Sequence, residues 1–296
     1  MKELFFNPSG KFKILQFTDI HYTNGNTADH KTTKLMEMLI REEKPEFIIM
    51  TGDTVYGPDN LENLTKALKP VMDSGIPWSY TFGNHDTEDG VDETVLFSKL
   101  MSLPGCVVYN ADPWISGMAN HYLEIKTQEG AIKWILFGID SGNYNKLENV
   151  GGYSYVKSDQ IDWYKKVTRE YKQKDSDSSS LVFMHIPLPE YREVWGQQQC
   201  SGNKKEGVCS PDINSGFFTA ILEEGHTKGI FVGHDHINDY MGSLYGIKLG
   251  YGRATGYNTY GQEGYLKGAR ILVLDENNNS DFETYIRLED SRKEWQ

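Results

Sequence analysis

The sequence predicts an α/β fold in which two stacked sheets carry helices on their outer sides. Strand-like apolar runs alternate with helical patterns over about the first 100 residues, an order typical of parallel strands joined by right-handed crossovers. A pattern typical of antiparallel strands begins at about Val107, and buried strand-like runs return near residue 181. Large two-sheet architectures reach 296 residues as one unit, so we expect a single domain over residues 1–296.

The first elements alternate between strand and helix. The runs "KILQF", "EFIIM" and "WSYTF" are mostly apolar, which is typical of strands buried on both faces. After the first run, Leu35, Met36, Leu39 and Ile40 recur at helical spacing. The expected order is strand 13–17, helix 32–41, strand 46–50, helix 60–72, strand 78–82 and helix 92–102.

The second half begins with an expected antiparallel hairpin, in which "HYLEIKT" and "IKWILFGID" flank a "QEG" turn. Helix 158–171, strand 181–184, helix 216–224 and strand 229–232 are expected to follow. The segment of about 186–215 is too long for a plain connector, so we expect it to form an insert or lip over a site. Residues of about 240–290 form a C-terminal β-rich part, because Gly, Tyr and β-branched residues alternate there.

Composition and charge restrict the classes of partner. The chain is 38% hydrophobic and 24% charged and has no apolar run of about 18 residues, so we expect no membrane span. A formal net charge of −12 argues against electrostatic binding to nucleic acid, and no nucleic-acid partner is expected. The N-terminus shows no signal peptide, which implies a cytoplasmic protein if the chain is complete and an exported one if it is a mature form. The oligomeric state is unknown at this stage.

The three cysteines exclude one kind of metal site. The chain has an odd number of cysteines, and none of them forms a C-x-x-C pair, which rules out a Cys-rich zinc site. They are Cys106, Cys200 and Cys209. Cys200 and Cys209 either close a short disulfide or remain free thiols.

Histidines gather where strands are expected to end, which is the edge at which α/β sheets bind ligands. Five of the eight histidines lie in "FTDIHY" (His21), "GNHD" (His85), "FMHIP" (His185) and "FVGHDHIND" (His234 and His236). Two metal ions about 3.5–4 Å apart need a bridging carboxylate, imidazoles and oxygen donors. Asp53 is the natural bridge, because it follows Gly52 at a strand end and can present both oxygens.

The ordered motifs D-x-H, G-D, G-N-H-D, a lone His and G-H-x-H resemble those of the calcineurin-like metallophosphoesterase superfamily. The resemblance implies a four-layer α/β/β/α sandwich of two mixed sheets flanked by helices. It also implies one metal site of Asp19, His21, Asp53 and His236 and another of Asp53, Asn84, His185 and His234. The two ions would be divalent or trivalent, and this donor set suits Mn, Fe, Zn or Co.

Such a site predicts a phosphatase that hydrolyses phosphate monoesters of small molecules by attack of a metal-bridging hydroxide. His85 is the predicted acid or phosphate stabiliser, and Asp86 is expected to fix its tautomer and orientation. One alternative is a phosphodiesterase acting on cyclic nucleotides or other small molecules. A remote alternative is a non-catalytic metal-binding or scaffold module.

A second resemblance concerns "GDTVY", which is similar to the G-D-x-x-Y motif of purple acid phosphatases. In that branch the tyrosine binds iron and the first motif is D-x-G, whereas here His21 takes the glycine position. We therefore expect Tyr56 to pack beside the ligands, with metal ligation as the alternative.

Four further residues lie near the expected site, and three of them have two interpretations each. Tyr191 and Trp195 in the lip either stack on a base or aryl group of the substrate or pack within the loop. Arg253 is either a fork for a phosphate oxygen or a surface residue, and Asp235 is expected to be a solvated turn carboxylate.

Overall fold

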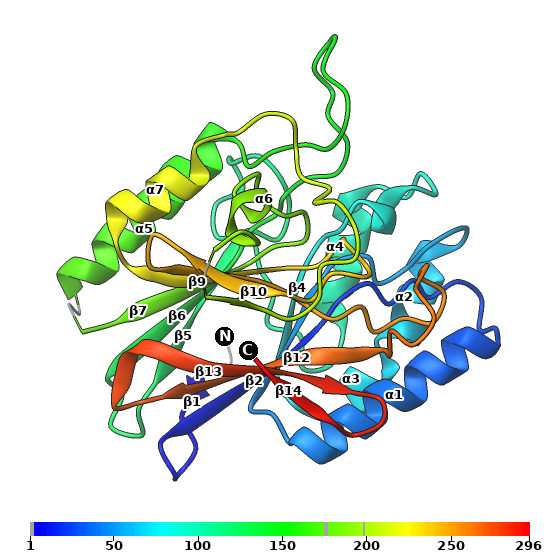
Figure 1. Ribbon diagram of the computed structural model, residues 1–296, viewed down its shortest axis with the longest axis horizontal. Coiled ribbons are helices and arrows are strands. Elements are labelled where there is room, and N and C mark those ends of the chain that lie inside the picture. The colour runs from blue at the N-terminus through cyan, green and yellow to red at the C-terminus, as the bar shows by residue number, and fades with distance from the viewer. Residues whose placement is uncertain (1–2, 175–176, 198) are drawn as a thin grey trace.

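The computed structural model shows two sheets packed face to face between two layers of helices (Figure 1). It describes residues 3–174, 177–197 and 199–296. In the described chain the larger sheet has the order β1 (Leu4–Phe5), β5 (His121–Lys126), β6 (Ile132–Gly138), β7 (Ser179–Phe183), β9 (Thr227–Val232), β11 (Ile247–Tyr251), β10 (Met241–Leu244) and β8 (Cys200–Ser201). The smaller sheet has the order β14 (Lys293–Trp295), β13 (Asn278–Leu288), β12 (Gly268–Asp275), β2 (Lys11–Phe17), β3 (Phe47–Thr51) and β4 (Trp78–Thr81).

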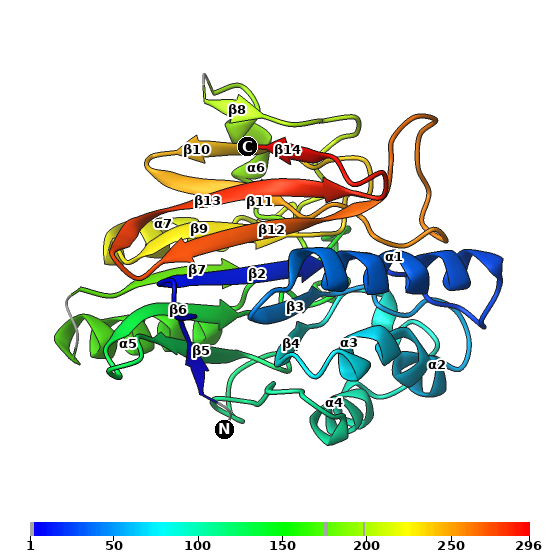
Figure 2. The same ribbon diagram turned by 90° about the horizontal axis from the view of Figure 1, so that it is seen from below.

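Helices cover the outer face of each sheet (Figures 1 and 2). The layer on the smaller sheet consists of α1 (Thr27–Glu43), α2 (Asn60–Ala67), α3 (Lys69–Asp73) and α4 (Glu93–Ser102). The layer on the larger sheet consists of α5 (Ser158–Lys174), α6 (Tyr191–Val194) and α7 (Phe217–Glu224). Both sheets mix parallel and antiparallel neighbours, so the predicted four-layer α/β/β/α sandwich is confirmed.

Three hydrophobic cores separate the four layers. In β2, Ile14 packs between the sheets, whereas the next residue, Leu15, packs against the helices. Between the sheets, Phe183 and Phe231 stack with their ring centroids 5.7 Å apart. Since a central strand is buried on both faces, its sequence is a continuous apolar run, and this pattern made the strands recognisable.

Two predicted helices have different bounds in the structure. The expected helix 60–72 is divided into α2 and α3, because Pro70 lacks an N–H donor and its ring cannot follow a helical turn. The helix expected at 32–41 begins earlier, at Thr27. Asn26 and Asp29 form a capping box there, in which each side chain accepts a hydrogen bond from the other residue's backbone N–H.

The predicted lip contains α6 and β8, and β8 pairs with β10 at the edge of the larger sheet. Cys200 and Cys209 within it are free thiols in this structure, which favours the second of the two alternatives. No helix in the described ranges combines the length and the apolar character needed to cross a membrane.

Arg270, on β12, links the two sheets through a fully buried guanidinium group. Its Nε donates to the carbonyl of Tyr251 on β11 at 2.6 Å, and Nη2 donates to the carbonyl of Asp239 at 2.8 Å. Nη1 donates to Oγ1 of Thr284 on β13 at 3.0 Å. One side chain therefore satisfies polar groups of both sheets.

We expect Arg270→Ala to lower the free energy of unfolding by about 3 kcal/mol or more, because the buried acceptors lose their donor and a cavity remains. Urea denaturation checks this. Arg292→Ala is the matched control, since the Arg292 side chain is 60% exposed, and it should leave the urea midpoint unchanged. Equal midpoints for the two variants would contradict the prediction.

Candidate metal centre

The candidate ligands lie where strands of both sheets end. Strands β2, β3 and β4 run parallel in the smaller sheet, and β7 and β9 run parallel in the larger one. Asp19 follows β2, Asp53 follows β3, Asn84 follows β4, His185 follows β7 and His234 follows β9. Because the carboxyl ends of parallel strands share one edge, the loops after them meet.

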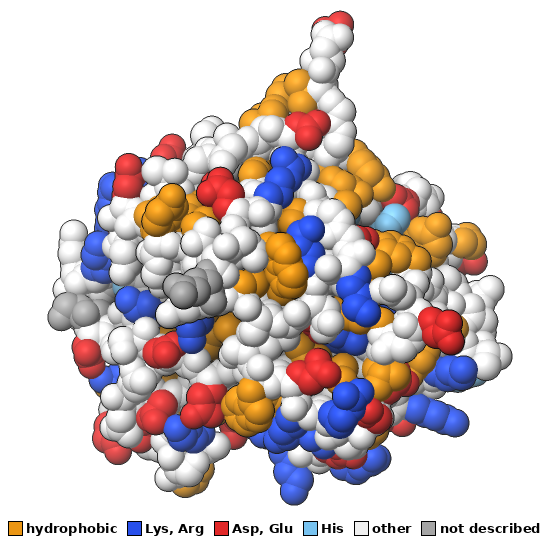
Figure 3. Space-filling view, viewed as in Figure 1, with side chains coloured by type: hydrophobic (Ala, Val, Ile, Leu, Met, Phe, Trp, Pro, Cys, Tyr) orange, Lys and Arg blue, Asp and Glu red, His pale blue; other side chains and the backbone are white. Residues whose placement is uncertain are grey.

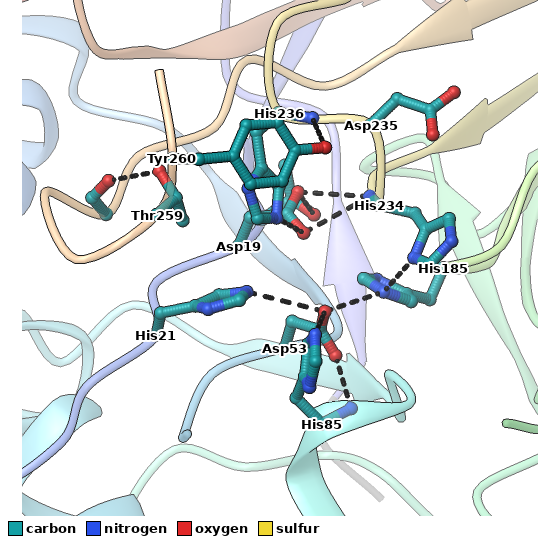
Figure 4. Close-up of polar contacts among 12 residues, drawn as sticks. Asp19, His21, Asp53, His85, His185, His234, Asp235, His236, Thr259 and Tyr260 are labelled. Atoms are coloured by element: carbon teal, nitrogen blue, oxygen red, sulfur yellow. Dashed lines mark hydrogen bonds and ion pairs between the residues drawn. The ribbon is translucent and has the colours of Figure 1, made fainter. Parts of the chain in front are cut away.

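The structure brings these side chains into two adjoining groups of buried residues (Figure 4). One group is Asp19, His21, Asp53 and His236, and the other is Asp53, His185 and His234, with the donor atoms of each group within 4.8 Å of one another. Asp53 belongs to both, because its Oδ2 lies 3.4 Å from Nε2 of His21 and 3.1 Å from Nε2 of His185. The two groups contain six of the seven predicted ligands, all but Asn84, and metal binding by them stays a prediction.

The backbone at these ligands is strained. Asp19, His21, Asp53 and His234 all have positive φ angles, between 50° and 76°, a region that residues other than glycine seldom adopt. Neighbouring glycines make the close approach of the loops possible. A Cβ atom on Gly83 would lie 2.2 Å from Oδ1 of Asp53, so only glycine fits there.

Several candidate ligand atoms have no hydrogen-bond partner among the described residues although they are buried. These atoms are Nε2 of His21, Oδ2 of Asp53 and Oδ1 of Asn84. An unpartnered buried polar atom costs about 1–3 kcal/mol, and a metal ion bound by these lone pairs would remove that cost. The donor set therefore fits two metal ions.

The charges of the buried groups also fit metal ligation. Burial alone would raise the pKa of Asp53, but the His185 and His21 imidazoles hold that pKa well below its usual value. Burial and the neighbouring His185 lower the pKa of His234 to about 3, which leaves its imidazole neutral. An ionised carboxylate and a neutral imidazole are the forms that bind metal. Although burial lowers the pKa of His185, the Asp53 carboxylate raises it to about 10, so a metal ion bound by His185 would displace a proton.

A family model for calcineurin-like phosphoesterases matches residues 12–238. The chain belongs to the calcineurin-like phosphoesterase family. Members use divalent metal ions, and the dinuclear cluster described above is in keeping with that.

The names of similar proteins differ in whether they describe an active phosphatase. The chain is 35% identical over 308 residues to the Arabidopsis thaliana protein named "Probable inactive purple acid phosphatase 14", covering 92% of this chain and 77% of the relative. It is 30% identical over 265 residues to "Phosphatase DCR2" of Saccharomyces cerevisiae, covering 78% of this chain and 45% of that protein. A solved dimetal phosphatase from Danio rerio has a TM-score of 0.64 at 12% identity over 96% of both chains, which shows a shared fold.

His85 borders the phosphoesterase cluster. It lies in a short 3₁₀ helix, η1 (His85–Thr87), and its backbone N–H donates to Oδ1 of Asp53 at 2.8 Å. Its Nε2 lies 3.9 Å from Oδ2 of Asp53, and its Nδ1 contacts the carboxylate of Glu88. The other oxygen of Glu88 accepts a hydrogen bond from the hydroxyl of Tyr144 at 2.5 Å. Glu88 thus holds the imidazole, a role that the sequence analysis did not assign.

Asp86 does not orient His85, and that prediction is wrong. The Asp86 carboxylate is buried and accepts the backbone N–H groups of Thr54 at 2.8 Å and Gly83 at 2.8 Å. It also accepts the N–H of Asp53 at 3.2 Å. Burial and the nearby Asp53 carboxylate raise the pKa of Asp86 to about 6 despite these amides. Asp86 therefore holds the loop that carries Asp53.

The predicted substrate contacts lie elsewhere in the structure. Tyr191 is fully buried and donates its hydroxyl to the carbonyl of Ile230, so it cannot stack on a substrate. Trp195 packs on Tyr240 with ring centroids 5.1 Å apart. Loop packing is thus the correct interpretation for both residues.

Arg253 is neither a phosphate fork nor a surface residue. It is buried, pairs with Asp239 and lies 3.2 Å above the ring of Tyr265. Asp235 is likewise buried rather than solvated, and it accepts the hydroxyl of Tyr251 at 2.6 Å. The Arg253 guanidinium and the Asp235 carboxylate both interact with other buried side chains of the protein.

Tyrosines line the cluster. Tyr56 packs beside His21 and His85, with centroid distances of 5.4 and 5.0 Å, in keeping with the packing interpretation. Tyr153 lies 4.3 Å from His234, and Tyr260 lies 4.1 Å from His236. Tyr153 and Tyr260 were missed, because a lone tyrosine in a Gly-rich loop resembles ordinary packing.

We expect the purified protein to bind two metal ions per chain. His236→Ala should lose one ion, since it breaks only the first group, whereas Asp53→Asn should lose most of both. Elemental analysis after desalting measures the stoichiometry, and His226→Ala, which removes a histidine hydrogen-bonded to Ser180 away from the cluster, is the control. Two ions retained by Asp53→Asn would contradict the shared-ligand arrangement.

Proposed function

We propose that the protein is an active phosphoesterase that hydrolyses phosphate monoesters of small molecules with two metal ions. The observation that carries the proposal is the buried set of six candidate ligands in two groups that share Asp53. When bound, such ions activate water as a nucleophile and neutralise charge on the phosphoryl oxygens. Mn, Fe, Zn and Co all suit the imidazole, carboxylate and amide donors.

The chain's own residues support each role. Asp19, His21, Asp53 and His236 would hold one ion, and Asp53, Asn84, His185 and His234 the other. Nδ1 of His185 faces the carbonyl of Thr51 at 2.8 Å, which leaves Nε2 directed at Asp53. Asp86 fixes the Asp53 loop through backbone amides.

His85 would donate a proton to the leaving oxygen. Glu88 would accept the Nδ1 proton, so the proton passed to the leaving oxygen would be a second one carried by Nε2 on the Asp53 side, with the ring returning to the neutral form. The side chain is 25% exposed, so a substrate can reach it.

Family membership alone does not decide activity. One relative is named as inactive and another as a phosphatase. In this chain every predicted ligand position is filled and the ligands converge, which favours catalysis over a scaffold role.

A phosphodiesterase with the same metals is the second candidate. The burial of Arg253 removes the expected guanidinium fork for a phosphate dianion. The groups that contact the cluster from outside include tyrosines and the Glu88 carboxylate. Because none of these groups is positively charged, they favour a diester, which carries one negative charge, over a monoester dianion.

Stripping the protein with a chelator should abolish hydrolysis of p-nitrophenyl phosphate, and adding back Mn, Fe, Zn or Co singly should restore it. Asp53→Asn should stay inactive with every metal. The same assay with bis-p-nitrophenyl phosphate gives the monoester to diester ratio, which separates the two candidates. Two bound ions without turnover of either ester would overturn the proposal in favour of a metal-binding module.

We expect His85→Ala to retain both ions and lose about 10²–10⁴-fold in kcat, the contribution typical of a general acid. Glu88→Gln should lower kcat about 10–100-fold with KM unchanged, since it only orients His85. Glu129→Gln, an exposed substitution in a hairpin turn, is the matched control. Full activity of His85→Ala would remove it from the mechanism.

A further inference from the structure

A groove of about 1160 Å³ adjoins the metal centre on the His85 side. Tyr56 and Glu88 form its inner end, and Leu61 on α2 and Val91 before α4 lie farther along it. The first two also contact His85, so the groove begins where the metal centre ends. Figure 3 shows hydrophobic side chains beside the histidine surface on the right of the molecule.

The position of His85 relates the groove to the reaction. Its Nε2 faces Asp53, whereas its Nδ1 side faces Glu88 at the inner end of the groove. The transferred proton would leave Nε2 on the Asp53 side, and Tyr56, which packs against the rings of both His21 and His85, is the groove residue that borders this side. The volume is far larger than a phosphoryl group requires, and it slightly exceeds the range of about 300–1,000 Å³ typical of sites for whole organic ligands.

Part of the groove wall is apolar. Tyr56 and Leu61 are 43% and 37% exposed, and Pro58 and Val91 join them along the wall. Exposed apolar side chains gathered in one concave surface are typical of a binding site for apolar groups.

Negative charge predominates along the groove. The carboxylates among its described lining residues are Asp59, Glu62, Glu88 and Asp89, against the two ammonium groups of Lys66 and Lys99. Lys66 is already paired with Glu62 at 2.7 Å. An anionic leaving group, such as a nucleoside diphosphate, would meet net repulsion beginning at Glu88.

We propose that this groove binds the leaving group of the substrate and selects an apolar chain that carries no negative charge. The proposal rests on the proposed function for the direction in which the leaving group departs. It assigns the substrate class as phosphate esters of apolar alcohols.

Alkylphosphonates test the groove without requiring turnover. The metal-loaded protein should bind hexylphosphonate about 30-fold more tightly than methylphosphonate, measured by calorimetry, because the added methylenes are partly buried. A hexyl chain ending in a carboxylate should lose at least about 10-fold of that gain. Glu62→Gln, which frees Lys66, should restore part of the affinity for the carboxylate probe alone.

Leu61→Asp should reduce the preference for hexylphosphonate to about 3-fold or less and leave methylphosphonate binding unchanged. Val95→Asp is the matched control, because it introduces the same charge at a residue that is 45% exposed on α4 and lies outside the groove. Equal binding of the two phosphonates, or a preference that survives Leu61→Asp, would overturn the proposal.

Hydrolysis of hexyl and methyl phosphate distinguishes this proposal from the proposed function. Preferential binding of hexylphosphonate without hydrolysis of either ester would sustain the groove and defeat the proposed function. Hydrolysis of both esters at the same kcat/KM would defeat the groove and sustain the proposed function.

Discussion

The Asp53 carboxylate is buried where strands of two different sheets end, and the rest of the site is arranged around it. β3 brings Asp53 to this point, β7 brings His185 to 3.1 Å, and the loop after β2 brings His21 to 3.4 Å. A buried carboxylate is costly unless cationic groups or hydrogen-bond donors surround it. The two sheets must therefore pack in one register, because a shift of either would leave this charge uncompensated.

The same loops hold conformations that are unfavourable by themselves. A positive φ in a residue other than glycine costs about 1–3 kcal/mol, and Asp19, Asp53 and His234 each adopt one. The three hydrophobic cores and the sheet-bridging Arg270 supply the rigidity that maintains this strain. Bound metal would add to this rigidity, since it would be held by buried atoms such as Oδ2 of Asp53, which has no hydrogen-bond partner among the described residues.

Sequence identified the fold and the residues that converge at the site, because parallel strands place their carboxyl ends on one edge and each candidate ligand follows a strand within four residues. It could not identify the partner of His85. Asp86 is adjacent in sequence, but in a 3₁₀ helix the side chains of residues i and i+3 lie on one face, so Glu88 contacts His85 and Asp86 points into the loop. Arg253 was misplaced for a related reason, since its partner Asp239 comes from a loop whose course depends on tertiary packing.

Electrostatics gives the metal ions a second role besides activating water. The chain carries a formal charge of −12, and the groups beside the cluster include the Glu88 carboxylate and several tyrosines. The arginine expected to supply positive charge is neutralised by Asp239. The ions would thus be the main attraction for a phosphate group, so loss of metal removes substrate affinity together with catalysis. Two bound cations would attract the phosphoryl group of a substrate, whereas the acidic groove would repel any second anionic group on it.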